Sequence, residues 1–385
     1  MSFLRKIFLT VFAASLSAAA VTFFQKSLNV VTEFREFLPG LVVLLPVAGL
    51  VIGFFNQRFG RLSGGGVSLV LYEMAQTQKI LSWITVPLIY VGTLLSHLVG
   101  ASTGREGAAL QIGATLADQV SRFISLAALE RQLLLKSALV ASFGTALAAP
   151  VAGIVFVWEF SRTRRWRSLP YLLVAAIIGQ KVSVWLQVPH TVWRIPTLPD
   201  WQLTHVWGLP GLVLAFAFIA SLYLWLHHHL DQLGKRWVSS PALRTALAGS
   251  ALLAFYWSQG ETRYAGLGIP VIEGALSGVA RDMDSWFKMG TTLLSTALGF
   301  KGGEFTALVF IGSTAGVTLA QILPFTPEFL AALGFVSVFA AVTGAQLTMA
   351  VVAAEIFLPG IFPWALIVTV LTNKLTRGVR LYSAN

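Results

Sequence analysis

Long apolar runs constrain the fold of this chain more than any other feature of its sequence. Four of them approach the ~20 residues that an α-helix needs to cross the hydrocarbon of a bilayer. They are residues 7–24, 38–55, 80–99 and 208–226, and further apolar runs lie at 133–158, 169–187, 242–257, 286–299 and 329–357. Because the strands of a membrane barrel are shorter and alternate in polarity, the runs predict an all-α polytopic membrane protein.

The composition agrees with a surface that faces lipid. Hydrophobic residues make up 56% of the 385 residues, charged residues make up 11%, and the mean hydropathy is +0.75. Soluble domains carry about 25% charged residues, so this inventory cannot easily cover a water-facing surface. The chain has no cysteine, which excludes disulfides and thiolate metal sites. We expect no cofactor and no metal.

The charge balance bears on topology. Lys and Arg number 27 against 16 Asp and Glu, a net charge of +11. Nucleic-acid-binding proteins show such an excess, but in a membrane protein basic residues collect on cytoplasmic loops, so we expect no nucleic acid partner. We place the chain in the cell membrane as a multi-pass protein, with the N-terminus and the basic loop 161–169 in the cytoplasm. Arg5 and Lys6 also fit a signal peptide, yet the long run after them and the many later spans favour a retained helix.

The sequence contains a weak internal duplication. Residues 110–118 resemble 309–317 and residues 149–159 resemble 345–355, in the same order and at offsets of 199 (Ile112 to Ile311) and 196 (Glu159 to Glu355). Such pseudo-repeats indicate two similar halves that meet at a binding site near the membrane midplane. We expect one transmembrane domain over 1–385, with halves at roughly 60–187 and 208–385 and no soluble regulatory domain.

Each copy of the first repeated segment, 110–118 and 309–317, follows a charged, glycine-rich segment. These segments are "TGREG" (103–107) and "FKGGEFT" (300–306). Glycine lets two backbones approach closely, and the first amides of a helix have no partner within it. A helix start also carries about half a positive charge and can hold an anion. The sequence therefore predicts a permease for a small anion, with helix starts from both halves converging on it.

These motifs resemble those of the CLC chloride channels and exchangers. "GREG" followed by "LQIG" (104–113) is similar to one family signature, and 299–316 is similar to another as the fluoride/proton-exchanging branch has it. Residues 149–159 resemble the mid-chain helix, and 380–385 resemble the terminal tyrosine motif. The resemblance, from about residue 60 to the end, implies two inverted-topology halves with short, broken helices at a midplane anion site. It also implies a homodimer that moves halide and protons.

The resemblance assigns roles to individual residues. Glu106 matches the gating glutamate, whose carboxylate occupies the anion's place and takes up protons. The amides of Phe305 and Thr306 and the hydroxyl of Tyr382 match the inner anion contacts. The remaining residues expected to bind the anion are Gly104, Arg105, Gly107, Val67 and Ser68. For Arg105 itself we favour a structural role, in which it holds its loop by hydrogen bonds. The alternative for Glu106 is a carboxylate paired with Arg105 at a helix cap.

Two further positions concern protons. Glu304 matches a glutamate that is tied to proton coupling in the fluoride branch, and its alternative is a helix-start residue favoured by the dipole. Phe160 stands where chloride exchangers have an internal proton-accepting glutamate. Glu159 and Glu355, at matching places in the repeat, are expected to cap a helix or to pair with loop bases such as Arg162 and Lys374.

The chain also departs from the family patterns. Gly66-Val67-Ser68 matches neither the Gly-Ser-Gly-Ile-Pro motif of chloride members nor the Gly-Asn-Asn of the fluoride branch. Ser68 lies one position after the place of the serine in the chloride motif, and its hydroxyl is the candidate to replace the hydroxyl of that serine. Ala108 follows Gly107 where chloride members have proline and fluoride members have threonine, and Ala307 likewise replaces a proline.

We therefore expect halide transport, in first place fluoride/proton antiport with fluoride export. The alternative is a voltage-gated type of chloride channel or a chloride/proton exchanger. An enzyme is not expected, since the chain has no "HExxH" and no nucleophile with a partner base. A receptor or scaffold would need a soluble input domain. His227, His228 and His229 point in different directions on a helix and do not suggest a metal site, and His97 is expected to be packed and hydrogen-bonded.

Overall fold

The structure is a computed structural model that describes residues 3–382 except 64, 162–165, 189, 192, 194–197 and 200–202. The described residues form sixteen α-helices. The first eight are α1 (Phe3–Phe37), α2 (Leu45–Ser63), α3 (Gly66–Gln76), α4 (Thr85–Leu98), α5 (Glu106–Asp118), α6 (Ala128–Leu147), α7 (Pro150–Glu159) and α8 (Leu169–Trp185). The second eight are α9 (Leu203–Trp237), α10 (Pro241–Gln259), α11 (Ile269–Leu276), α12 (Asp284–Thr296), α13 (Phe305–Leu319), α14 (Pro327–Thr343), α15 (Gln346–Ile356) and α16 (Phe362–Leu375). Short 3-10 helices span Pro39–Leu44, Gln119–Arg122, Trp166–Ser168 and Pro359–Ile361.

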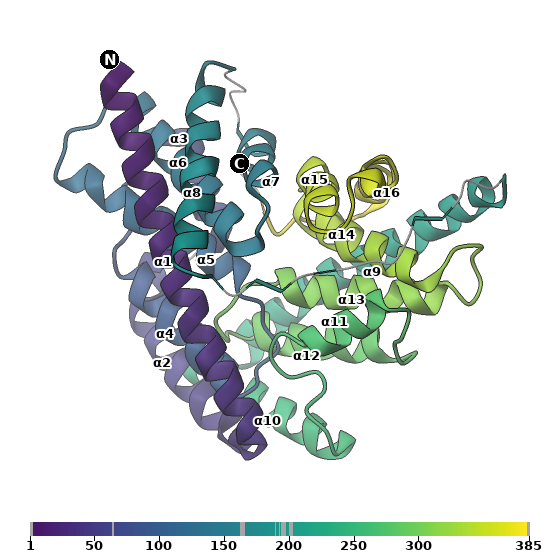
Figure 1. Ribbon diagram of the computed structural model, residues 1–385. Coiled ribbons are helices and arrows are strands. Elements are labelled where there is room, and N and C mark those ends of the chain that lie inside the picture. The colour runs from purple at the N-terminus through teal and green to yellow at the C-terminus, as the bar shows by residue number, and fades with distance from the viewer. Residues whose placement is uncertain are drawn as a thin grey trace.

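The order of helix lengths repeats after α8. The helices α1 and α9 have 35 residues each, α2 and α10 have 19 each, and α7 and α15 have 10 and 11. Figure 1 shows the purple-to-blue helices on one side of the molecule and most of the green-to-yellow helices on the other. The repeat of lengths leads us to propose that the first half begins with α1 rather than near residue 60.

The two halves have opposite directions across the membrane. The helices α2 and α10 pack antiparallel, since a Cβ on Gly249 would meet the Leu45 carbonyl oxygen at 2.4 Å and one on Gly53 would meet the Ala242 Cα at 2.5 Å. The start of α10 therefore lies beside the later part of α2. Because α9 leads into α10 and α1 leads into α2, the two long helices α1 and α9 run in opposite directions. This is the inverted topology that the family resemblance implied, and it relates the two similar halves that the duplication predicted.

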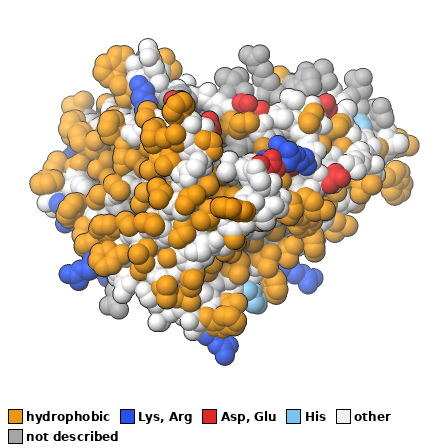
Figure 2. Space-filling view, turned by 90° about the horizontal axis from the view of Figure 1, so that it is seen from below, with side chains coloured by type: hydrophobic (Ala, Val, Ile, Leu, Met, Phe, Trp, Pro, Cys, Tyr) orange, Lys and Arg blue, Asp and Glu red, His pale blue; other side chains and the backbone are white. Residues whose placement is uncertain are grey.

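Within the part of the chain that the structure describes, four segments are long and apolar enough to cross a membrane. They are Phe3–Phe37, Pro39–Gly60, Trp166–Trp185 and Leu203–Trp237. Figure 2 shows a broad surface of hydrophobic side chains, with Lys and Arg mainly at its margins, as a lipid-facing belt requires. The predicted run 80–99 is shorter as a helix, because residues before Thr85 form a turn whose Leu81 amide donates to Asp118.

Two of the long apolar runs are broken in equivalent places. The run 133–158 is divided at Ala148, which has a φ of +56° and is followed two residues later by Pro150. The run 329–357 is divided at Gly344, with a φ of +88°. A left-handed residue ends a helix, and the short helices α7 and α15 begin just after it.

Candidate functional site

The helices α5 and α13 begin side by side at the boundary of the two halves. Gly104 and Gly303 form an isolated antiparallel bridge, in which the Gly104 amide donates to the Gly303 carbonyl at 2.5 Å and the Gly303 amide donates back at 2.7 Å. The helix α5 begins at Glu106 and α13 at Phe305, directly after this bridge. The structure thus brings together the segments 104–107 and 303–306.

Glycine is required for this approach. A Cβ on Gly104 would lie 3.1 Å from both the Gly303 oxygen and the Thr306 nitrogen. A Cβ on Gly303 would lie 2.8 Å from the Gly107 nitrogen. No neighbouring atom is the end of a flexible side chain, so a larger residue would separate the two helix starts.

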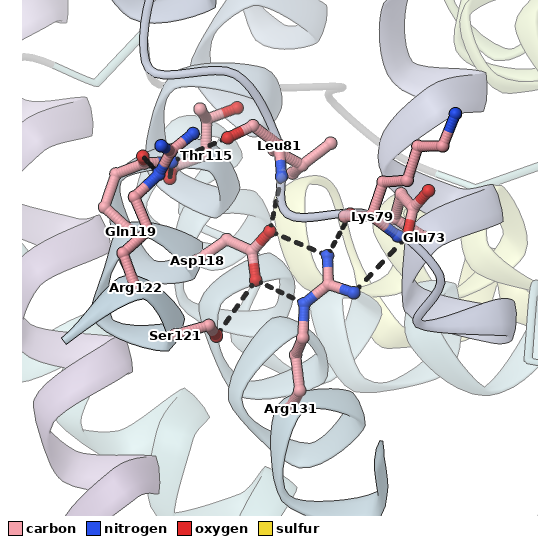
Figure 3. A network of polar contacts seen from close by, with 9 residues as sticks. All are labelled: Glu73, Lys79, Leu81, Thr115, Asp118, Gln119, Ser121, Arg122 and Arg131. Atoms are coloured by element: carbon pink, nitrogen blue, oxygen red, sulfur yellow. Dashed lines mark hydrogen bonds and ion pairs between the residues drawn. The ribbon is translucent and has the colours of Figure 1, made fainter. Parts of the chain in front are cut away.

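A buried charge network holds the opposite end of α5 (Figure 3). Arg131 on α6 donates to both oxygens of Asp118, the last residue of α5, at 2.7 and 2.8 Å. Its third nitrogen lies 3.4 Å from the carboxylate of Glu73 on α3, and all three residues are buried. Asp118, Arg131 and Glu73 therefore hold α5, α6 and α3 together at this end.

Glu106 lies at the first position of α5 and contacts the other half of the molecule. The Thr306 hydroxyl donates to its carboxylate, with Oγ1 2.8 Å from Oε2 and 3.0 Å from Oε1. The Arg105 amide donates to Oε2 at 3.1 Å, and the Arg105 Nε lies 3.4 Å from Oε1. The expected ion pair with Arg105 is present, but the shorter contacts come from the start of α13.

Arg105 also holds its loop, as predicted. Its guanidinium donates to the side-chain oxygen of Asn29 on α1 at 3.2 Å, and the side chain is buried. Arg105 thereby ties the start of α5 to the long first helix of the same half.

Two small cavities are lined by Glu106 and Phe305. One, of about 20 Å³, is also lined by Arg105, Thr306 and the segment around His190. The other, of about 10 Å³, is also lined by Gly107 and Tyr382. By the same measure a water molecule needs roughly 10–15 Å³, so each cavity has room for about one small particle.

Tyr382 lies at the second cavity among aromatic rings. Its ring centroid is 6.0 to 6.4 Å from those of Phe156, Phe160 and Phe339, at steep angles. A Cβ on Gly107 would be 3.7 Å from the Tyr382 hydroxyl, so this hydroxyl faces the start of α5. Phe160, the position of the missing glutamate, instead places a ring against Tyr382.

The third helix start near the site is that of α3. Gly65 and Gly66 adopt left-handed backbone conformations, with φ of +107° and +57°. A Cβ on Gly107 would be 3.6 Å from a methyl group of Val67, so Val67 faces α5. The Ser68 hydroxyl donates to the Leu381 carbonyl at 2.8 Å and so ties α3 to the segment that carries Tyr382.

Glu304 precedes α13 but does not cap it. Its side chain makes no capping hydrogen bond, and its Oε1 lies 3.6 Å from the Nε2 of His227 on α9. In the sequence, His227 stands out only as part of a histidine triplet. The triplet does diverge as predicted, since His228 contacts Gln232 and His229 contacts the Trp225 carbonyl.

Glu159 and Glu355 cap each other's helices. The Glu159 carboxylate accepts the amides of Leu347 and Thr348 at the start of α15, both at 2.9 Å. The Glu355 carboxylate accepts the amides of Val151 and Ala152 at the start of α7, at 2.9 and 2.7 Å. The capping role is confirmed, and Arg162 lies outside the described residues. His97 is fully buried, with its Nε2 3.3 Å from the Thr103 hydroxyl.

Comparisons with known proteins agree with this architecture. Residues 48–377 match the family model described as voltage gated chloride channel. A chloride/fluoride channel protein of Pseudomonas syringae pv. tomato is 34% identical over 379 residues, covering 96% of this chain and 84% of that protein. An H(+)/Cl(-) exchange transporter ClcA of Vibrio cholerae is 24% identical, covering 89% of this chain and 80% of that protein.

Solved structures show the same fold. The crystal structure of a CLC-type fluoride/proton antiporter has a TM-score of 0.91 at 28% identity, over 100% of this chain and 98% of its own. The structure of a slow cyanobacterial Cl-/H+ antiporter has a TM-score of 0.85 at 17% identity, covering 98% and 96% of the two chains. With a family match over most of its length and a relative at 34% identity, this multi-pass membrane protein belongs to the CLC family.

Proposed function

We propose that this CLC-family anion transporter is a fluoride/proton antiporter that exports fluoride, with Glu106 as its gate. The observation that carries the proposal is the contact of the buried Glu106 carboxylate with Thr306 at the start of α13. A carboxylate from one half thus occupies the place where the helix starts of both halves converge.

The physical basis is competition between two anions. Each helix start carries about half a positive charge and unpaired amides, so two starts together favour one negative group between them. A charged side chain within the membrane costs several kcal/mol unless it is partnered, and here the partners are Thr306 and Arg105. A substrate anion that takes this place displaces the carboxylate, and a protonated carboxyl group leaves it more readily. Anion entry and proton uptake are then coupled.

The inner contacts follow from the second cavity. We assign the anion there to the amides of Phe305 and Thr306 and to the Tyr382 hydroxyl, with Gly104, Gly107 and Val67 shaping the approach. Tyr382 lies within electrostatic range of both Glu106 and Glu304. Ser68 supports this region by holding Leu381, and Glu304 is the proposed internal proton carrier.

Fluoride is favoured over chloride by three observations. The 34% identical relative is named a chloride/fluoride channel protein and the 28% identical structure is a fluoride/proton antiporter. Phe160 replaces the glutamate of chloride exchangers, while Glu304 is present. The cavity beside Tyr382, about 10 Å³, is of the size that one water molecule or one fluoride ion occupies.

Flux measurements test the proposal. The purified protein is placed in liposomes loaded with fluoride or with chloride, and anion and pH electrodes follow efflux. The expected result is fluoride efflux with opposing proton movement, and Glu106→Gln should abolish the proton movement because an amide cannot take up a proton. Chloride flux without fluoride flux would exclude the fluoride assignment, and fluoride flux without proton movement in the parent protein would indicate a channel.

A further inference from the structure

His227 and Glu304 form a partly buried pair of titratable groups at the start of α13. The Nε2 of His227 lies 3.6 Å from the Glu304 Oε1, and the two side chains are only 22% and 20% exposed. A proton donor and acceptor need about 2.6–3.2 Å, and such contacts are often longer before the active complex forms. The separation of 3.6 Å is therefore compatible with a proton-transfer pair outside its active complex.

The inverted halves place a different pair at the equivalent position. Arg105 precedes α5 as Glu304 precedes α13, at an offset of 199 residues. Arg105 contacts Asn29 on the first long helix, and Glu304 contacts His227 on the second, at an offset of 198 residues. In the first half the partners cannot exchange a proton near neutral pH, whereas in the second half both can.

A polar stripe leads from His227 to the end of α9. Asp231 and Lys235 follow at intervals of four residues, so the three side chains share one face of the helix. Lys235 Nζ lies 2.6 Å from Asp231 Oδ2, and the stripe becomes more exposed along its length, with Lys235 60% exposed. Eight residues of helix span about 12 Å. Arg244 of α10 approaches this helix at Gly234. The titratable neighbours of His227 also include His228, the next residue, and Tyr223, whose ring centroid lies 6.0 Å from that of His227.

The stripe opens on the side of the membrane where the chain begins. The end of α9 leads into the start of α10, which lies beside the later part of α2. That end of α2 is on the same side as the start of α1, because α1 and α2 follow each other across the membrane. Arg5, Lys6, Lys235 and Arg236 mark this side as the cytoplasmic one.

We propose that His227 transfers protons between the cytoplasmic solution and Glu304, and is thus a second proton-carrying residue of the transporter. The inference rests on the proposed fluoride/proton exchange. In the step, the Nε2–H bond of the imidazolium breaks and an O–H bond forms at Glu304 Oε1, which leaves neutral imidazole and a carboxylic acid. The imidazole then takes up a proton from water that enters along Asp231 and Lys235.

Replacement of single histidines tests this role. The full-length parent, His227→Gln and His228→Gln are reconstituted in liposomes, and fluoride and proton fluxes are recorded together while the pH is varied on each side. In His227→Gln, the protons moved per fluoride should fall at least tenfold. The dependence of proton flux on the pH of the side facing α9's end should also flatten, and the dependence on the opposite side should stay. His228→Gln, one residue away with a different partner, should match the parent.

The outcomes separate this inference from the proposed function. If the parent protein moves fluoride without protons, both the proposed fluoride/proton exchange and the role of His227 are overturned. A parent that couples the two ions, together with a His227→Gln protein of unchanged proton flux and pH profile, overturns the role of His227 alone. Fluoride flux in the same vesicles reports correct folding, and His227→Asn replaces His227→Gln if the glutamine variant carries no fluoride.

Discussion

Thr306 contributes more than a backbone amide to the site. The resemblance to the family predicts a role only for its amide. In the structure its hydroxyl donates to both oxygens of Glu106 and so holds the carboxylate in place. Hydrogen bonds to charged groups contribute about 1.5–3 kcal/mol. The hydroxyl therefore sets how readily Glu106 gives way to an anion.

Removal of this hydroxyl should loosen the coupling. In Thr306→Val the balance between the bound and the released carboxylate should shift by about 10- to 100-fold, from the ~1.5–3 kcal/mol of such a bond. Fluoride should then pass with fewer protons, and Thr306→Ser should behave like the parent. The ratio of fluoride to proton flux measures the effect, and a valine variant that keeps the parent ratio would show that Thr306 does not hold the gate.

Single residues were predictable only where a local pattern carries the chemistry. Glu106 stands between glycines before an apolar helix, and this pattern already indicates a charge at a helix start. His227 was missed because its partner Glu304 is 77 residues away and the contact exists only in the folded chain. Ser68 stays a predicted anion ligand, and its hydrogen bond to the Leu381 carbonyl, at the far end of the sequence, is visible only in the folded chain. The internal repeat is the one sequence feature that bears on this contact, because it relates Glu304 to Arg105 and His227 to Asn29.

Among the elements, the two helix starts depend most on small residues. The Gly104–Gly303 bridge leaves no space for a side chain between α5 and α13. The caps at α7 and α15 are of another kind, because each helix carries in its last turn the carboxylate that accepts the first amides of the other. Caps of this type contribute about 0.5–2 kcal/mol each. The helices α7 and α15 therefore form an antiparallel pair that is capped at both ends.

A methyl group at Gly303 should disable the site. Its Cβ would lie 2.8 Å from the Gly107 nitrogen, and overpacking of this kind costs about 1–3 kcal/mol. We expect Gly303→Ala to lower fluoride flux at least tenfold and to lower the melting temperature. Gly290→Ala is the matched control, since a Cβ there meets nothing within 4 Å. Equal fluxes in both variants would show that the close approach is not needed for transport.

Elements were predictable by type rather than by length. Apolar runs identified α1, α2, α8 and α9 as membrane-spanning helices. The division of the run 133–158 at Ala148 was not expected, because alanine favours helix and its left-handed backbone is imposed by the packing of α6 and α7. The helix α5 ends at Asp118, whose carboxylate pairs with Arg131, since a charged group within the membrane needs a partner.

At the scale of the whole molecule, the inverted topology determines on which side of the membrane each loop lies. The start of α1 and the end of α9 lie on one side, and the end of α10 lies on the other. The loop that carries Val279 lies near the end of α10, because Arg281 pairs with Glu261. Residues 162–165 of the basic loop lie outside the described residues. The homodimer and the single domain stay predictions of the resemblance.

Cysteine labelling should confirm the sidedness. The chain has no native cysteine, so Leu4→Cys and Val279→Cys each provide one exposed thiol. In intact cells a membrane-impermeant maleimide should label Val279→Cys but label Leu4→Cys only after permeabilisation. The positive-inside rule sets this direction. Labelling in the reverse order would place the N-terminus and the His227 stripe outside the cell.

The bridge between Gly104 and Gly303 also determines where such a protein can be re-engineered. The hydrogen bonds of the bridge are made by main-chain atoms alone. A side-chain substitution therefore cannot change their strength in small steps. The adjustable parts are the side chains that surround it, above all Val67, Phe305 and Tyr382. Libraries that aim at another halide would vary these three and leave both glycines fixed.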